Sequence, residues 1–169
     1  GFDLAVRLAE EAGVAAIGFH PRAASKGHKG LPDYALTREL TERIEVPVIV
    51  SGGLSGAAAA RQAYEESGAD AVMIARGSLG NPWVFEELTG RRAAPPSQAE
   101  VAEELLWVVD RAEEHLGPER AERYLRKFYP WYFEGIGADK RVRDELQRTA
   151  DLARARQLIE AARTPVGVA

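Results

Sequence analysis

The chain has no cysteine, which excludes disulfide bonds, thiolate metal ligands and a cysteine nucleophile among its 169 residues. It also has no apolar run of about 18 residues and no signal-peptide pattern, so we expect no membrane partner. We assign no metal site to the chain. A cysteine-free chain fits a reducing compartment, and the cytoplasm is the predicted location.

Positive charge is not in excess either. The 22 Lys and Arg residues stand against 26 Asp and Glu, which gives a formal net charge of -4. A general basic surface that attracts nucleic acid is therefore excluded, and an RNA partner would have to bind local cations. With 46% hydrophobic and 28% charged residues, the composition is typical of a globular protein with a real core.

The first half of the sequence repeats a helix followed by a strand three times. The helices carry apolar residues at helical spacing, and two of them end at a glycine, Gly13 and Gly68, which is a typical C-cap. The predicted strands are residues 14–19, 47–50 and 71–75. Because these strands are apolar throughout, we expect a parallel sheet that is buried on both faces.

Candidate functional residues follow each predicted strand. They are His20 after the first strand, Gly52 and Gly53 after the second, and Arg76 and Gly77 after the third. In a (β/α)8 barrel the sites lie at the carboxyl ends of strands, and the loops after strands 7 and 8 often hold phosphate. Glycines let an anion approach backbone N–H groups, and an arginine adds a fixed cation, so this pattern predicts a phosphate site.

Each of these features also has a purely structural interpretation. A glycine pair after a strand is commonly a tight turn, and a histidine such as His20 is more often exposed than functional. Arg22 would face the same way as His20 in an extended segment. The stretch GNPW can start a helix, with Asn81 as N-cap, Pro82 at the first position and Trp83 packed below.

A helical region is predicted after a proline-rich linker, with Ser97 as its first N-cap. The expected helices are residues 101–116, 119–133 with a break at Pro130, and 140–162. We expect the aromatic residues of this region to lie mostly in the core of a helical bundle. These residues are Trp107, Trp131, Tyr132 and Phe133.

Several segments resemble the second half of a tRNA-dihydrouridine synthase. In order along the chain they are HPR, KGLPDY, VPVIVSGGLS and ADAVMIARGSLGNPWVFEEL. The most specific is ARGSLGNPW, which is similar to the family's GRGALGNPW. The resemblance covers residues 1 to about 90 well, and a weaker likeness extends to RKFYPWYFEGIGADKRVRDEL.

This resemblance implies an α/β fold: the C-terminal part of a (β/α)8 TIM barrel, strands 6 to 8, over residues 1–94, and an all-α helical domain over residues 97–164. It implies FMN as cofactor, NADPH as reductant, and tRNA as the substrate in which uridine is reduced to 5,6-dihydrouridine. The cofactor-binding residues that it implies are His20, Ser51, Gly52, Gly53, Ala75 and Arg76. The family usually reads Asn-Gly-Asp at positions 51 to 53, so any interaction of the asparagine side chain would be missing or shortened here, while backbone interactions would persist.

The family's general-acid cysteine and flavin-ring lysine have no counterpart in this sequence, because the resemblance places both before Gly1. We therefore assign no catalytic residue within the chain. An intact barrel needs about 250 residues, so the chain is expected to be part of an enzyme and to be inactive alone.

In the family the helical domain helps to hold tRNA, and local cations are the candidates for that contact. They are Arg22, Lys140, Arg141 and Arg148, with Lys26 and Lys29 as a second choice on the barrel rim. Lys140, Asp144 and Arg148 share one helical face, so the acidic neighbour weakens the expected patch.

Two other classes of function remain open at this point. Another phosphate-binding TIM-barrel enzyme, such as a lyase or an isomerase of a sugar phosphate, would use the same strand-end loops but would not account for the helical domain. A non-catalytic RNA-binding module would account for the helices and cations but would leave the glycine loops without a role.

Overall fold

The computed structural model describes residues 1–23, 25 and 30–163 of an α/β chain. The chain divides into two compact units. The first, the α/β unit, comprises Gly1–Ser78 and Val84–Arg92; the second, the helical unit, comprises Leu79–Trp83 and the chain from Ala93 onward.

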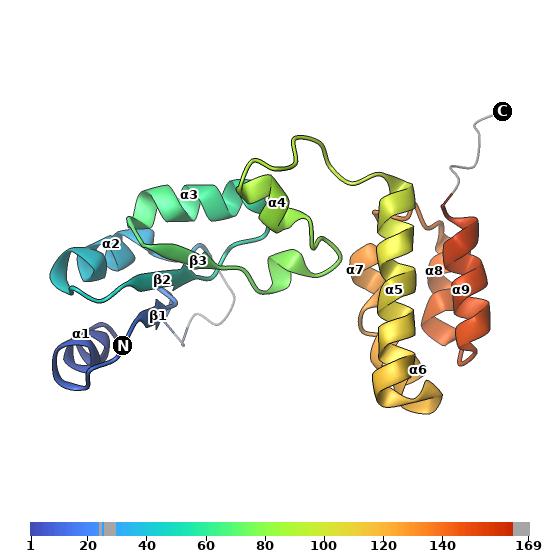
Figure 1. Ribbon diagram of the computed structural model, residues 1–169, viewed down its shortest axis with the longest axis horizontal. Coiled ribbons are helices and arrows are strands. Elements are labelled where there is room, and N and C mark those ends of the chain that lie inside the picture. The colour runs from blue at the N-terminus through green and yellow to red at the C-terminus, as the bar shows by residue number, and fades with distance from the viewer. Residues whose placement is uncertain (24, 26–29, 164–169) are drawn as a thin grey trace. The chain divides into compact units, whose positions relative to one another are not determined.

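The α/β unit holds a parallel sheet of three strands in the order β1-β2-β3 (Figure 1). The strands are β1 (Ile17–Phe19), β2 (Val48–Ser51) and β3 (Ala71–Met73), and the helices are α1 (Phe2–Glu11), α2 (Tyr34–Arg43), α3 (Ala57–Ser67) and α4 (Val84–Leu88). The three predicted helix–strand repeats are thus confirmed; β1 and β3 are shorter than expected, and β2 has the expected length but lies one residue later. The glycines at the ends of α1 and α3 are left-handed, with φ of 61° at both Gly13 and Gly68, as a C-cap requires.

One face of the sheet packs against helices. Its core is formed by side chains of α1, α2, β1 and β2 together with Ile44 after α2 and Ala69 before β3; the members within the four elements are Ala5, Val6, Ile17, Phe19, Leu40, Val48 and Val50. Strand residues alternate between faces, so the intervening positions point to the other side of the sheet.

That other face is open. Gly18, Ile49 and Ala71 lie side by side in register across the three strands, and Met73 pairs with Ser51. Gly18 and Ala71 are exposed, and Met73 is 52% exposed. The expectation that the strands are buried on both faces is therefore wrong for the described residues, because α1, α2 and α3 contribute to cores on one face and no described layer covers the other.

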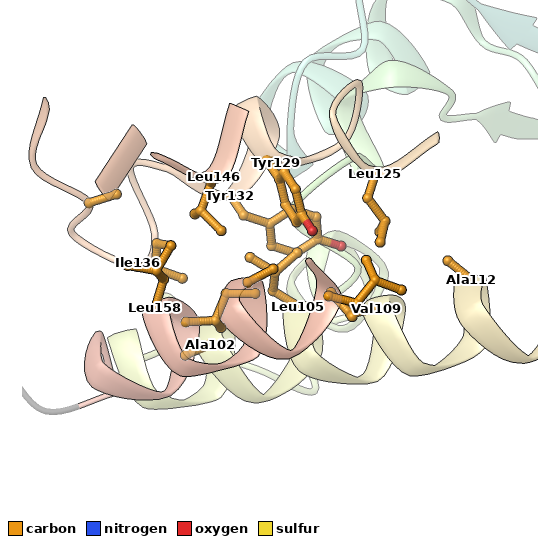
Figure 2. Close-up of a cluster of buried hydrophobic side chains, with 14 of the residues drawn as sticks. Ala102, Leu105, Val109, Ala112, Leu125, Tyr129, Tyr132, Ile136, Leu146 and Leu158 are labelled. Atoms are coloured by element: carbon orange, nitrogen blue, oxygen red, sulfur yellow. The ribbon is translucent and has the colours of Figure 1, made fainter. Parts of the chain in front are cut away.

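The helical unit contains α5 (Gln98–Leu116), α6 (Pro118–Leu125), α7 (Tyr129–Tyr132), α8 (Lys140–Arg148) and α9 (Leu152–Ala161). These helices enclose one apolar core, and Figure 2 shows side chains from different helices meeting in it. Helix α5 starts three residues earlier than predicted because Ser97 and Glu100 form a complete capping box. Tyr129 and Leu105 are among the largest fully buried side chains.

Three expectations for the helical region need correction. The helix predicted from residue 119 breaks at 126–128, before Pro130, which lies in the first turn of α7. The helix predicted over 140–162 is two helices, because Asp151 accepts a hydrogen bond from the Ala153 N–H at 2.8 Å and starts α9. Trp107 and Trp131 are 57% and 47% exposed and so are not core residues, in contrast to Tyr132.

The GNPW stretch does not act as the helix cap that its sequence suggests. Helix α4 begins only at Val84, and the Oδ1 atom of Asn81 is buried without a hydrogen-bond partner. The stretch instead belongs to the helical unit, where Trp83 packs against the core. A Cβ atom on Gly80 would lie 2.1 Å from the Trp131 carbonyl oxygen, so only glycine fits this approach.

Candidate functional site

The residues that follow the strands gather at one edge of the sheet, because the carboxyl ends of parallel strands lie together. His20 follows β1, and its imidazole lies against Gly52, which follows β2. A Cβ atom on Gly52 would be only 2.5 Å from Nε2 of His20. Two residues that the sequence separates by more than a helix are thus neighbours, and glycine is required for that contact.

The loop after β2 has an unusual backbone that only glycine adopts easily. Gly52 and Gly53 have φ of 95° and 74°, both in the region that L side chains avoid. The Tyr34 hydroxyl donates a hydrogen bond to the Gly52 carbonyl oxygen at 2.8 Å. A Cβ on Gly53 would lie 2.8 Å from that hydroxyl and 3.0 Å from Cδ of Pro32.

The end of β3 is packed against the same loop. Arg76 begins a 3-10 helix, Arg76–Ser78, directly after the strand. A Cβ on Gly77 would lie 2.1 Å from the Leu54 carbonyl oxygen, so the loops after β2 and β3 touch through their backbones. Ser78 closes the turn, since its N–H and its hydroxyl both donate to the Ala75 carbonyl oxygen, at 3.1 and 2.8 Å.

Arg22 follows His20 by two residues, and its backbone N–H donates to the His20 carbonyl oxygen at 2.8 Å. Its Nη2 donates to the Gly30 carbonyl oxygen at 2.9 Å, while its Nε is buried without a partner. The Asp33 N–H donates to the Pro21 carbonyl oxygen at 2.8 Å, which ties the start of α2 to the segment after β1. Burial raises the pKa of the Tyr34 hydroxyl above its ordinary value, and the Arg22 guanidinium partly opposes this increase.

This arrangement suits an anionic group. Among the described residues the Gly53 N–H has no hydrogen-bond acceptor, and the two glycines leave the backbone open to close approach. Arg76 is exposed at the end of β3 and supplies positive charge at the same edge. The residues present therefore fit a phosphate-bearing cofactor, whereas no group of three or more His, Cys, Asp or Glu that could hold a metal ion occurs in the part of the chain that the structure describes.

The candidate RNA-contacting residues of the helical unit lie together on α8. They line a surface depression. The residues around this depression are Lys140, Arg141, Asp144, Glu145, Arg148 and Thr149. The three RNA candidates Lys140, Arg141 and Arg148 are thus brought together, and Asp144 lies among them as expected. Lys26 and Lys29 lie outside the described residues.

Not all cations of this depression are equally available. Arg141 is paired with Glu145 at 3.8 Å, and Arg154 donates to the same carboxylate at 2.6 Å. The hydrogen bond from Arg154 lowers the pKa of Glu145, which therefore stays charged. Within the described ranges, neither Lys140 nor Arg148 forms an ion pair with a carboxylate, so these two are the cations of the depression that are most available to a partner.

Sequence reasoning missed Tyr34 and Pro32 as members of the site. Both belong to the KGLPDY segment, whose presence supported a family resemblance without indicating any role. The proline and the aromatic residue just before and at the start of a helix were the available signal, but only the fold shows that they reach the Gly52–Gly53 loop.

In the described part of the chain, no helix has both the length and the apolar character needed to cross a membrane.

Comparison with known proteins shows the family of the chain. The family model described as dihydrouridine synthase matches residues 3–166. A probable tRNA-dihydrouridine synthase of Mycobacterium leprae (strain TN) is 36% identical over 146 residues, which are 83% of this chain and 38% of the relative.

Two further relatives are named tRNA-dihydrouridine synthase B. The one from Xanthomonas axonopodis pv. citri (strain 306) is 34% identical over 75% of this chain and 40% of its own length. The one from Escherichia coli (strain K12) is 29% identical over 92% of this chain and 50% of its own length. The chain thus spans half or less of the length of these relatives, and it belongs to the dihydrouridine synthase family.

Proposed function

We propose that this chain is a portion of a tRNA-dihydrouridine synthase that reduces uridine in tRNA to 5,6-dihydrouridine, with FMN as cofactor and NADPH as reductant. The observation that carries the proposal is the meeting of the three strand ends, where His20 lies against Gly52 and Gly77 lies against the Leu54 carbonyl oxygen. Family membership supports it, since the relatives are named for this reaction. Family membership also favours this function over a sugar-phosphate enzyme or a non-catalytic RNA-binding module.

In this proposal β1, β2 and β3 are the last three strands of a (β/α)8 barrel over residues 1–94, and residues 97–164 are the C-terminal helical domain. The open face with Met73 and Ala71 would then point into the barrel, where further strands of the complete protein would cover it. The general-acid cysteine would come from those other strands, so the chain by itself would be inactive.

The residues of the site would bind and orient the cofactor. The Gly53 N–H and Arg76 would hold the phosphate, with Ser51 and Ala75 beside them, and His20 would contact the flavin from the end of β1. A hydrogen bond between a charged arginine and phosphate is shorter and stronger than a neutral one. FMN, when bound, would supply the hydride that NADPH provides, and the protein would supply binding and orientation.

The tRNA would be held through the phosphate backbone by local cations, because the chain as a whole is acidic. Lys140 and Arg148 on α8 are the first candidates, Arg141 is weakened by its pairing with Glu145, and Arg22 could contribute from the α/β unit. The cytoplasm is the compartment that we propose for this reaction.

The test uses the protein of the complete reading frame that contains this chain. We expect it to purify with bound flavin and to restore dihydrouridine to the tRNA of a strain that lacks its own dihydrouridine synthases. Dihydrouridine is measured by mass spectrometry of digested tRNA. Flavin-free protein that releases a sugar-phosphate product, or that binds RNA without reducing it, would support one of the other two classes instead.

A further inference from the structure

We propose that Tyr34 is a positioning residue that aims the Gly53 N–H at the cofactor phosphate. This inference rests on the proposed function, because the phosphate is that of FMN. It is based on one hydrogen bond, from the Tyr34 hydroxyl to the Gly52 carbonyl oxygen at 2.8 Å, and on the direction that this bond gives to the N–H of the same peptide group.

The Gly52 carbonyl and the Gly53 N–H belong to the same peptide plane. In a planar trans peptide the C=O and N–H bonds point in opposite directions, so holding the carbonyl toward Tyr34 turns the N–H away from it. The Gly53 N–H has no acceptor among the described residues. Its direction is thus set by Tyr34, and it remains available as a donor.

The loop needs such a restraint because glycine is free to leave this conformation. Both glycines have positive φ, and glycine populates positive and negative φ about equally. Without the hydroxyl the Gly52–Gly53 peptide could rotate, and its donor would no longer face one direction. Pro32, whose Cδ lies 3.0 Å from the position of a Gly53 Cβ, limits the loop by contact but offers no hydrogen bond.

Tyr34 is itself held in place. It is the first residue of α2, whose N-cap Asp33 accepts from the Leu36 N–H at 3.3 Å. The Asp33 N–H donates to the Pro21 carbonyl oxygen, so the helix start is fixed to the segment after β1. Tyr34 therefore links the ends of β1 and β2, and its ring packs against both apolar clusters of the α/β unit.

The experiment compares two flavins in the complete protein and in its Tyr34→Phe variant. FMN carries the phosphate and riboflavin lacks it, and binding is measured by quenching of flavin fluorescence in the deflavinated protein. One neutral hydrogen bond contributes about 1 kcal/mol, so we expect Tyr34→Phe to weaken FMN binding about fivefold and to leave riboflavin binding unchanged. The preference for FMN over riboflavin should fall by the same factor.

The matched control is Tyr64→Phe on α3. Tyr64 is 47% exposed, and its hydroxyl makes no hydrogen bond in the described structure, so this variant should keep the preference of the unmodified protein. A ratio of two affinities is insensitive to a uniform loss of folded protein, and thermal unfolding of the flavin-free variants checks that loss directly.

The outcomes distinguish a failure of the positioning role of Tyr34 from a failure of the proposed function. If the unmodified protein prefers FMN but Tyr34→Phe keeps that preference, or weakens both flavins equally, the positioning role is overturned and the proposed function stands. If the unmodified protein binds neither flavin, the proposed function fails and this inference fails with it.

Discussion

The two units differ in how they close their cores. The helical unit surrounds one core with α5 to α9, so that Leu105 and Tyr129 are fully buried. The α/β unit packs its helices on one face of a three-stranded sheet and leaves Met73 exposed on the other. Helices that follow one another can enclose a core among themselves, whereas a parallel sheet needs a layer on each face and pairing at each edge.

The largest expected effect of this difference is on independent folding. We expect a fragment of residues 79–163, which contains the whole described helical unit, to unfold cooperatively on heating. A fragment of residues 1–92 should show no cooperative transition and should aggregate, because its open face and strand edges are templates for pairing. Circular dichroism and light scattering measure both properties.

Because the sheet is open on one face and at its strand edges, we also expect residues 1–169 alone to bind no FMN. A soluble, monomeric fragment of residues 1–92 with a sharp thermal transition would contradict this view. It would mean that the single covered face of the sheet is sufficient for stability.

The next largest effect is on the stability of the helical unit, and it compares a buried residue with an exposed residue of the same helix, α5. Leu105→Ala removes a fully buried side chain of α5 and should lower the free energy of unfolding by about 2–5 kcal/mol. Trp107→Ala lies two residues away at a position that is 57% exposed, and should change it by less than about 1 kcal/mol. Urea titration of the 79–163 fragment measures both, and equal losses would show that Trp107 is a core residue after all.

A smaller effect is expected at the candidate cofactor site. Arg76→Ala in the complete protein should weaken FMN binding about tenfold or more, since a charge-assisted hydrogen bond contributes about 1.5–3 kcal/mol. Arg61→Ala is the matched control in the same unit, because Arg61 donates to the carbonyl oxygens of Glu87 and Leu88 and is not assigned to the site. Unchanged FMN affinity in Arg76→Ala would remove this residue from the phosphate site.

The sequence allowed much of the α/β unit to be predicted, because its signals are local. Apolar periodicity gives the helices and strands, and Gly13 and Gly68 mark helix ends through their left-handed backbone. The strand ends also follow from the sequence, and the prediction that His20 lies at the same edge as Gly52 needs only a parallel sheet. Whether either residue binds a cofactor stays a prediction.

What could not be predicted depends on contacts between distant segments. The hydrogen bond from Tyr34 to Gly52 joins residues 18 positions apart, and no local pattern encodes it. Asn81 resembles an N-cap in sequence, but its segment packs on the helical unit, where Gly80 meets the Trp131 carbonyl. The capping expectation failed there because tertiary packing overrode local propensity.

The smallest expected effect concerns tRNA, and it sharpens the comparison because it should come from the helical unit alone. Lys140 and Arg148 are unpaired among the described residues, and exposed ion pairs contribute only about 0.2–1 kcal/mol each. Lys140→Ala combined with Arg148→Ala in the complete protein should therefore raise the tRNA dissociation constant by about two- to thirtyfold. The double variant should also reduce the log–log salt slope of tRNA binding by about 0.7–0.9 for each phosphate that it no longer binds, while FMN content stays the same.

Arg120→Ala on α6 is the control, because Arg120 is an exposed arginine outside the depression. If the double variant and the control give the same affinity and salt slope, α8 is only a solvated helix face, and the tRNA-binding surface must be sought around Arg22.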